Sequence, residues 1–301
     1  MTFRVADTTS SANLVDRINS QRSRVSVLQE QLSTGKRINR PSDDPAGAEM
    51  VLNLRTSQTE IQQFQRNADT ANQKLTATDD SLNSYQTILE RLQTLAAQGL
   101  SDTTPQSAKD AIATEIDTLR SRILSVANAK NGDEYLYGGT RQNTPPVDPI
   151  TGTPAATPTN PQFVQIEPGG NAVAVGATAE SIFSDATSTI FADLTNAAAA
   201  LRGTGNPIAD KAALQNFNSR LGVYSDQAAN ARVVIGANMR STEMAKDNLS
   251  SNLLSLDQRA SDIEGADFAQ TAVGLTDAQR ALDATLQVAA QGRKSLFDYL
   301  G

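Results

Sequence analysis

An almost uninterrupted heptad pattern between Met50 and Ala96 constrains the fold of this chain more than any other feature of its sequence. Apolar or aromatic side chains recur at alternating spacings of four and three residues, and only Ser57 and Thr78 break the series. A repeat of 3.5 residues places such side chains along one seam of a helix that faces a partner helix. The seam positions are Met50, Leu54, Ser57, Ile61, Phe64, Ala68, Ala71, Leu75, Thr78, Leu82, Tyr85, Leu89, Leu92 and Ala96.

The two ends of this helix are also marked in the sequence. Asp44 can cap the free N–H groups of the first turn, Pro45 suits the first helical position, and Gly99 is the expected end. At 1.5 Å per residue the helix would span roughly 80 Å, far more than an average globular helix. The pattern therefore predicts a mainly α fold, built as a long, antiparallel, coiled-coil-like helical rod.

Two further helices complete the expected bundle. One lies near residues 105 to 130 and ends at Asn131-Gly132, and its seam is Ile112, Ile116, Leu119, Ile123 and Val126. The other begins after Asn206-Pro207, and its seam is Leu214, Phe217, Leu221, Tyr224, Ala228, Ala231, Ile235, Asn238, Thr242, Ala245, Leu249, Asn252 and Leu256. Its three polar members either fix the helix register or mark a wetter seam, and both interpretations stay open.

Both ends of the chain carry heptad seams of their own. The N-terminal seam ends at Gly35, and the C-terminal one includes Phe268, Ala272 and Ala289. A short isolated helix is marginal in water, so we expect the two ends to pack together and then against other copies. The residues expected to carry this packing are Leu14, Ile18, Val25, Leu28, Leu32, Leu275, Leu282, Leu286, Leu296 and Phe297.

The middle of the chain has a different character. Seven of the 11 prolines lie between Pro145 and Pro168. Residues 163–167 alternate apolar and polar side chains, residues 168–170 read Pro-Gly-Gly, and residues 172–175 can return as a second strand, which predicts a β-hairpin. We therefore expect three parts: a terminal helical pair (1–44 with 265–301), a long helical bundle (45–140 with 207–264) and a small, Pro-rich β insert (141–206) that ends in a short amphipathic helix on Ile190, Leu194, Ala197 and Leu201.

The composition weakens most catalytic functions. The chain has no Cys and no His, which removes the commonest metal ligands and the commonest general base. Its net charge of −7 argues against non-specific nucleic-acid binding. No apolar run approaches the length of a membrane span, and the first 15 residues do not resemble a cleaved signal peptide. We expect no enzyme activity, no cofactor, no metal, no nucleic-acid partner and no membrane insertion.

Three short motifs contain residue types that can bind ligands or carry out catalysis. Gly35-Lys36 lacks the earlier glycine and the following Ser or Thr of a phosphate-binding loop. The Asp43-Asp44 pair is better explained by helix capping than by metal or acid–base chemistry. Gly138-Gly139 favours a turn over a ligand site, with Tyr135 and Tyr137 as core or interface aromatics.

Three stretches of the chain read LSTGKRINRPSDDPAGAEM from Leu32, EYLYGGT from Glu134 and SLFDYLG from Ser295. They resemble motifs of the hook–filament junction family of the flagellin superfamily. The usual flagellin pattern differs from the first stretch at Lys36, Pro41 and Pro45. It also differs from the ending of the third stretch. The insert, residues 141–206, corresponds to that of the junction family only by its position in the chain. The residues that carry the motif are Gly35, Lys36, Arg37, Asn39, Pro41, Asp43, Asp44, Pro45, Tyr135, Tyr137 and Gly139.

The resemblance implies a structural protein of the bacterial flagellum that is secreted unfolded through the type III channel and located extracellularly at the hook–filament junction. The partners it implies are other copies in a ring, the first hook-associated protein, flagellin and a type III export chaperone. Paired terminal helices would line the central channel of the axial structure.

Other functions remain possible at this point. Flagellin itself is the nearest, since it belongs to the same superfamily and forms filaments. A soluble coiled-coil adaptor or signalling protein would also satisfy the long heptads. An enzyme would need two carboxylates in a concave site, and nothing in the sequence locates such a pair.

Overall fold

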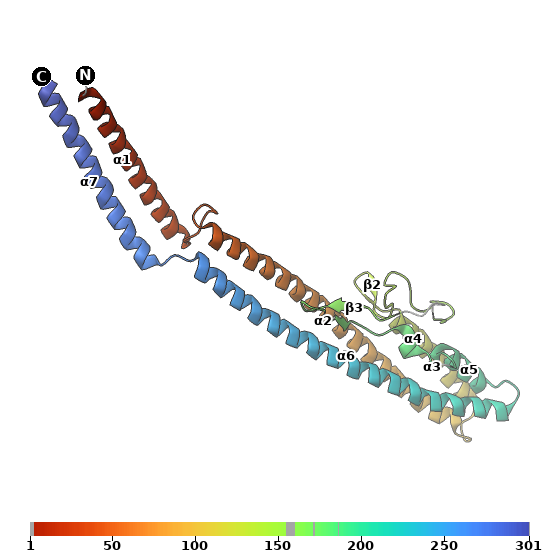
Figure 1. Cartoon of the computed structure of the whole chain (residues 1–301). Helices are drawn as coiled ribbons and strands as arrows, with labels where there is room; N and C mark the ends of the chain where they lie inside the picture. Colours follow the sequence, from red (N-terminus) through yellow and green to blue (C-terminus); the bar gives the residue numbers. More distant parts are fainter. Residues whose placement is uncertain (1–2, 155–159, 171, 186, 301) are drawn as a thin grey trace. The chain divides into compact units, whose positions relative to one another are not determined.

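The computed structural model describes the backbone of residues 3–154, 160–170, 172–185 and 187–300, and the side chains of these ranges from residue 12 to residue 290. Its helices are α1 (Phe3–Thr34), α2 (Pro45–Leu100), α3 (Gln106–Ala127), α4 (Ala179–Phe183), α5 (Ile190–Arg202), α6 (Pro207–Glu264) and α7 (Phe268–Leu300). Its strands are β1 (Lys130–Asn131), β2 (Glu134–Tyr135), β3 (Phe163–Gln165) and β4 (Ala172–Ala174). The expected fold class, mainly α with long antiparallel helix pairs and little β structure, is confirmed (Figure 1).

The chain divides into two compact units. The terminal unit comprises Met1–Glu60 with Asn252–Gly301, and the central unit comprises Ile61–Ser251. Helices α2 and α6 contribute residues to both units. The first residues of two long helices follow the predicted signals, because α2 begins at Pro45 and α6 begins at Pro207.

In the central unit the predicted seam of α2 is covered. From Ile61 to Ala96 every seam position is buried, apart from Phe64, which is half-buried. Each fully buried large apolar side chain contributes about 1.5–3 kcal/mol relative to an exposed one. This seam is therefore the main source of stability in the unit.

The start of the same pattern was predicted wrongly. Met50 belongs to the heptad by spacing, but its side chain is 56% exposed. Leu54 and Ser57 are half-buried. The period of the sequence thus continues beyond the stretch in which the chain itself provides a covering helix.

Helix α6 lies antiparallel to α2 within the central unit. Lys246 Nζ is 2.5 Å from Asp69 Oδ1, and Arg232 Nε donates to Asp79 Oδ1 at 2.8 Å. The residue numbers of bonded partners rise on α2 as they fall on α6, so the two helices run in opposite directions. Its predicted seam is buried over Leu214 to Ala228 and again at Ile235, Ala245 and Leu249.

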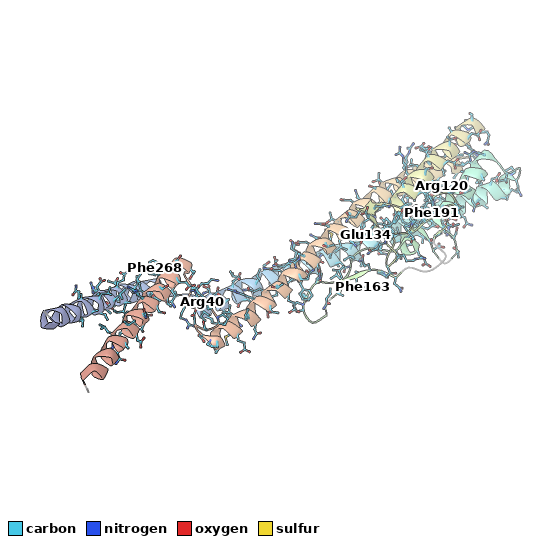
Figure 2. All side chains as sticks on the ribbon, turned by 90° about the horizontal axis from the view of Figure 1, so that it is seen from above. Arg40, Arg120, Glu134, Phe163, Phe191 and Phe268 are labelled. Atoms are coloured by element: carbon cyan, nitrogen blue, oxygen red, sulfur yellow. The ribbon has the colours of Figure 1, made fainter. Side chains whose placement is uncertain are left out.

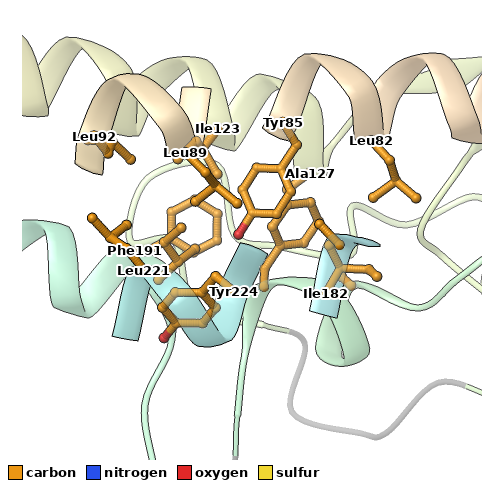
Figure 3. Packing of buried hydrophobic residues seen from close by; sticks show 14 of the residues in the cluster. Leu82, Tyr85, Leu89, Leu92, Ile123, Ala127, Ile182, Phe191, Leu221 and Tyr224 are labelled. Atoms are coloured by element: carbon orange, nitrogen blue, oxygen red, sulfur yellow. The ribbon is translucent and has the colours of Figure 1, made fainter. Parts of the chain in front are cut away.

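The widest part of the core adds α3, α4 and α5 to this pair. Helix α3 packs against α5, and its seam residues Ile112, Ile116, Leu119 and Ile123 are buried as predicted. The Tyr85 and Phe183 rings meet edge to face with centroids 4.9 Å apart. Figure 3 shows Leu221 and Tyr224 of α6 and Phe191 of α5 in the same cluster as Tyr85 of α2.

The polar seam residues of α6 have separate explanations. Asn238 Nδ2 donates to the carbonyl of Ala174 at 2.9 Å, so it holds strand β4 against the helix. The buried Thr242 hydroxyl donates to the carbonyl of Asn238 at 2.8 Å. Asn252 is exposed. The side chain of Asn238 therefore positions the insert. This role differs from both interpretations of the polar seam residues, which were a fixed helix register and a wetter seam.

The insert contains the predicted hairpin. Strands β3 and β4 pair antiparallel with Val164 opposite Val173, and the turn between them includes Gly169 and Gly170 with positive φ. The short helix α5 was predicted, with Ile190, Leu194, Ala197 and Leu201 buried, whereas α4 was not. The Asn131-Gly132 prediction needs correction, because α3 ends earlier, at Ala127, and Gly132 instead turns a second small hairpin, β1–β2, at a φ of 63°.

A polar network attaches the insert to α6. The Arg220 guanidinium donates to Asp193 Oδ2 at 2.5 Å and to Asp185 Oδ2 at 2.9 Å, and the Tyr224 hydroxyl donates to the same Asp193 oxygen at 2.7 Å. Burial alone would raise the pKa of Asp185. Hydrogen bonds from Thr187, from the Ser188 amide and from Arg220 outweigh it and lower the pKa below the ordinary value.

The lowered pKa of Asp185 predicts an acid-sensitive insert. A carboxyl with a depressed folded-state pKa stabilises the fold fully above its unfolded pKa, about 3.9, and progressively less as the pH falls below that value. We expect Asp185→Asn to destabilise the central unit at pH 7 and to reduce its loss of stability between pH 5 and pH 2. Guanidinium unfolding at a series of pH values measures both effects, and an unchanged pH slope in the variant would contradict the assignment.

The buried seam predicts a large difference between two substitutions in the central unit. Leu89 is 1% exposed and Met244 is 61% exposed. Leu89→Ala should lower the free energy of unfolding by about 2–5 kcal/mol, because it leaves a cavity. Met244→Ala should change it by less than about 0.5 kcal/mol. Chemical denaturation of the purified chain measures the difference, and equal effects would show that the seam is not closed.

Candidate functional site

The first motif forms the loop between α1 and α2 in the terminal unit. Gly35 ends α1 with a φ of +68°, a conformation that glycine adopts without a Cβ clash. The loop is bonded to the turn between α6 and α7. The Arg37 amide donates to the carbonyl of Glu264 at 2.6 Å, and the Ala266 amide donates to the carbonyl of Gly35 at 2.9 Å. Two segments more than 200 residues apart thus form one double turn.

Charged side chains reinforce the double turn. Glu264 lies between Lys36 Nζ at 2.9 Å and Arg55 Nη2 at 2.5 Å, and the Glu264 side chain is only 16% exposed. The Arg37 guanidinium donates to Asp44 Oδ2 and to the carbonyl of Ile263, both at 3.1 Å. The cations of the motif therefore bind the chain's own carboxylates and carbonyls. Figure 2 labels Arg40, from the same loop.

The two adjacent aspartates have structural roles. Asp44 Oδ1 accepts from the Gly47 amide at 3.0 Å, which confirms the predicted cap. That backbone hydrogen bond, together with the one from Arg37, lowers the pKa of Asp44. Asp43 Oδ2 accepts from the amides of Asn39 and Arg40, so it shapes the loop. Within the described residues no group of three or more Asp or Glu side chains could hold a metal ion.

Asn39 and Pro41 complete the loop. The Asn39 side-chain amide donates to the carbonyl of Lys36 at 3.0 Å, and Pro41 is exposed. The recorded hydrogen bonds of this motif stay within the double turn and the adjoining ends of α1 and α2, as when Arg40 bonds Glu30, which favours a structural role for the loop.

The second motif belongs to the central unit. Tyr137 is fully buried, its hydroxyl hydrogen-bonds with the Ser81 hydroxyl at 3.0 Å, and burial raises its pKa. Lys130 lies over the Tyr135 ring, 4.5 Å from the centroid. A Cβ at Gly138 would come within 2.7 Å of the Arg141 carbonyl oxygen, and Gly139 has a φ of +56°. The glycines therefore form a turn, and Tyr137 is a core aromatic.

The terminal helices α1 and α7 pack against each other. Leu14, Ile18, Val25, Leu28, Leu32, Leu275 and Leu282 are all half-buried. A Cβ built at Gly274 would lie 3.8 Å from a Leu28 methyl group, so the two helices approach closely there. Leu286 is 38% exposed. The side chains of Leu296 and Phe297 lie outside the described ones.

The chain resembles flagellar proteins over most of its length. Residues 5–140 match the family described as the bacterial flagellin N-terminal helical region. Flagellar hook-associated protein 3 of Escherichia coli (strain K12) is 26% identical over 278 residues, which cover 85% of this chain and 86% of that protein. The flagellin of Bacillus subtilis (strain 168) is 26% identical over 282 residues, 88% of each chain.

A solved flagellar protein has a similar fold. The crystal structure of FlgL from Xanthomonas campestris has a TM-score of 0.62 at 17% identity, over 69% of this chain and 99% of that chain. The chain is thus similar to flagellins and to hook-associated protein 3. The similarity to hook-associated protein 3 spans most of both chains and agrees with the resemblance that the sequence motifs had indicated.

The terminal unit leaves much apolar surface uncovered. Val15 of α1 is 55% exposed, and Val273 and Val288 of α7 are 62% and 60% exposed. Phe268, which was predicted to lie in the C-terminal seam, is 69% exposed, so that prediction was wrong. No described helix is both long and apolar enough to cross a membrane.

Sequence reasoning missed three residues of the double turn. Arg55 and Glu264 form an ion pair there, and the Gly265 amide donates to the Ser261 carbonyl, yet none of the three was singled out. The signal for Gly265 was present, because this glycine interrupts the heptad patterns of the two C-terminal helices. Nothing in the sequence alone pairs Glu264 with Lys36 and Arg55.

The close packing around Gly265 predicts that the double turn is sensitive to substitution at this position. A Cβ at this position would lie 2.5 Å from the Ser261 carbonyl oxygen, whereas a Cβ at Gly236 meets nothing within 4 Å. Gly265→Ala should destabilise the turn by about 1–3 kcal/mol, and Gly236→Ala should be neutral or stabilising by up to about 1 kcal/mol. Faster hydrogen exchange at the Arg37 and Ala266 amides measures the first effect. Unchanged exchange at both amides would refute it.

Proposed function

We propose that this chain is a structural subunit of the bacterial flagellum, located outside the cell at the junction between the hook and the filament. The observation that carries the proposal is the α1–α7 pair. It combines half-buried seam leucines with exposed valines, an arrangement suited to contacts with neighbouring subunits. The similarity to hook-associated protein 3 over 86% of that protein supports the location.

The finer assembly is also a proposal. Copies of the chain form a ring, one side of which meets the first hook-associated protein while the other meets flagellin. Unlike partners need unlike surfaces on the two sides. A type III export chaperone holds the C-terminal helix before secretion, when that helix has no neighbours.

We assign the roles of the three sequence parts in the same way. Residues 1–44 with 265–301 supply the axial core, 45–140 with 207–264 supply the supporting bundle, and 141–206 form the insert. Subunit contacts in the core are made by the terminal seam, which is Leu14, Ile18, Val25, Leu28, Leu32, Leu275, Leu282, Leu286, Leu296 and Phe297.

A second candidate function is that of a filament subunit, which the 88% coverage of the Bacillus subtilis flagellin favours. The two functions differ in abundance. A filament subunit would dominate a preparation of sheared filaments, whereas a junction subunit would be a trace component that stays with hook-containing particles. Quantitative mass spectrometry of the two fractions separates them.

Leu282→Asp should abolish incorporation of the chain into hook-containing particles. The substitution places an unpaired charge in an apolar seam, which costs several kcal/mol. Gln287→Asp is the matched control, because Gln287 is exposed on the same helix. Incorporation is measured by immunoblotting of purified particles and by swimming motility.

The control should assemble as the wild type does, and the purified Leu282→Asp chain should keep the stability of its central unit. Normal assembly and motility of Leu282→Asp would count decisively against the proposed packing.

A further inference from the structure

Helix α6 has a second apolar face that the central unit leaves open. Val223, Val233, Val234 and Met244, here called the α6 ridge, are 45%, 68%, 57% and 61% exposed. Val223 and Val234 are separated by 11 residues, as are Val233 and Met244, which is close to three helical turns. The four side chains therefore follow one side of the helix, away from the buried seam at Leu221, Ala228 and Ile235.

The α6 ridge is nearly free of charge. Between its first and last residues the face also presents Asp226, Asn230, Ala237 and Ser241. Among the nearby cations, Arg220 binds Asp193 and Arg232 binds Asp79, whereas Arg240 is exposed beside the ridge, seven residues after Val233. A partner for this ridge must therefore be a largely uncharged surface with a cation placed to meet Asp226 and an anion placed to meet Arg240.

Helix α3 presents such a surface. Its exposed side has small residues at spacings of four and three, here called the α3 stripe: Ser107, Ala111, Thr114, Thr118, Ser121 and Ser125. The hydroxyls of Thr114 and Thr118 donate to the carbonyls of Asp110 and Thr114 at 2.9 and 3.0 Å, so they need no outside partner. The stripe is thus a shallow, neutral track that lets another helix approach closely.

Charges beside the α3 stripe complete the match. Glu115 is bound by Arg91, and Asp117 is bound by Arg202, whereas Asp110 is exposed beside the stripe and accepts a hydrogen bond from the Gln106 side chain. Arg122 is exposed at the edge of the stripe, and no ion pair is recorded for it within the described part of the chain. The ridge and the stripe also have similar lengths, about 30 Å each at 1.5 Å per residue.

We propose that the α6 ridge of one copy packs on the α3 stripe of a second copy, with Asp226 opposite Arg122. The inference rests on the proposed function, since it supplies a contact between neighbouring junction subunits. Because the two surfaces differ, the contact is heterologous, and each copy keeps one free ridge and one free stripe. Such contacts generate rings or helical arrays instead of closed pairs.

Charge exchange tests the predicted pair. Asp226→Arg and Arg122→Asp should each lower incorporation into hook-containing particles about tenfold, because each sets like charges against one another. The double variant restores opposite charges and should recover most of the loss. Both residues are exposed, so circular dichroism of each monomer should match the wild type. Wild-type incorporation of both single variants, or no recovery in the double variant, would overturn the proposal.

Cross-linking tests the packing independently, because the chain contains no cysteine. Val233→Cys and Thr118→Cys are produced as separate chains and co-assembled, and the particles are then oxidised with copper phenanthroline. A disulfide-linked dimer should form only when both variants are present. Thr87→Cys replaces Thr118→Cys as the control, since Thr87 is exposed on α2, and it should give no dimer with Val233→Cys.

The outcomes separate the two proposals. Particles that contain the chain but give no Val233–Thr118 cross-link would overturn this contact and leave the junction function intact. Dimers formed by Val233→Cys alone would overturn the heterologous arrangement in favour of a symmetric pair. Absence of the wild-type chain from hook-containing particles would overturn both proposals.

Discussion

The closure of the α2 seam within the central unit is the constraint on which the rest of this structure depends. Leu75, Leu82 and Leu92 have no exposed surface, and the side chains that cover the seam come from the same chain. The terminal unit is built on the same heptad period, but its seam residues are only half-buried. One sequence pattern therefore has two outcomes. In the central unit other helices of the chain cover the heptad seam, and the seam becomes a buried core. In the terminal unit the seam is only partly covered, and it leaves an apolar surface for contacts with other subunits.

The polar residues of the motif bond to the chain's own backbone and side chains, and this geometry explains their structural use. Asp44 caps α2, Asp43 binds loop amides, and Glu264 binds two cations. These groups stabilise the double turn. Helix α1 ends at this turn and helix α7 begins just after it. A structural subunit needs such a joint, because the direction of the terminal helices decides which surfaces neighbouring copies meet.

Much of this could be predicted from the sequence, since it depends on local rules. The caps at Asp44 and Asn206, the seam from Ile61 to Ala96 and the β3–β4 hairpin all follow from spacing and turn chemistry. Met50 and Phe268 were misplaced because periodicity does not reveal where the covering partner ends. The ion pairs of Glu264 and the bond from Asn238 to strand β4 depend on tertiary contacts, so no local pattern could have indicated them.

Hydrogen exchange on the dilute monomer, followed by mass spectrometry, tests the central claim most directly. If assembly completes the terminal unit, the amides of residues 12–34 and 268–290 should exchange much faster than those of residues 61–96, and they should become protected in assembled particles. Protection of the terminal helices in the monomer equal to that of residues 61–96 would contradict the account, because the terminal pair would then be a finished fold with no need of neighbours.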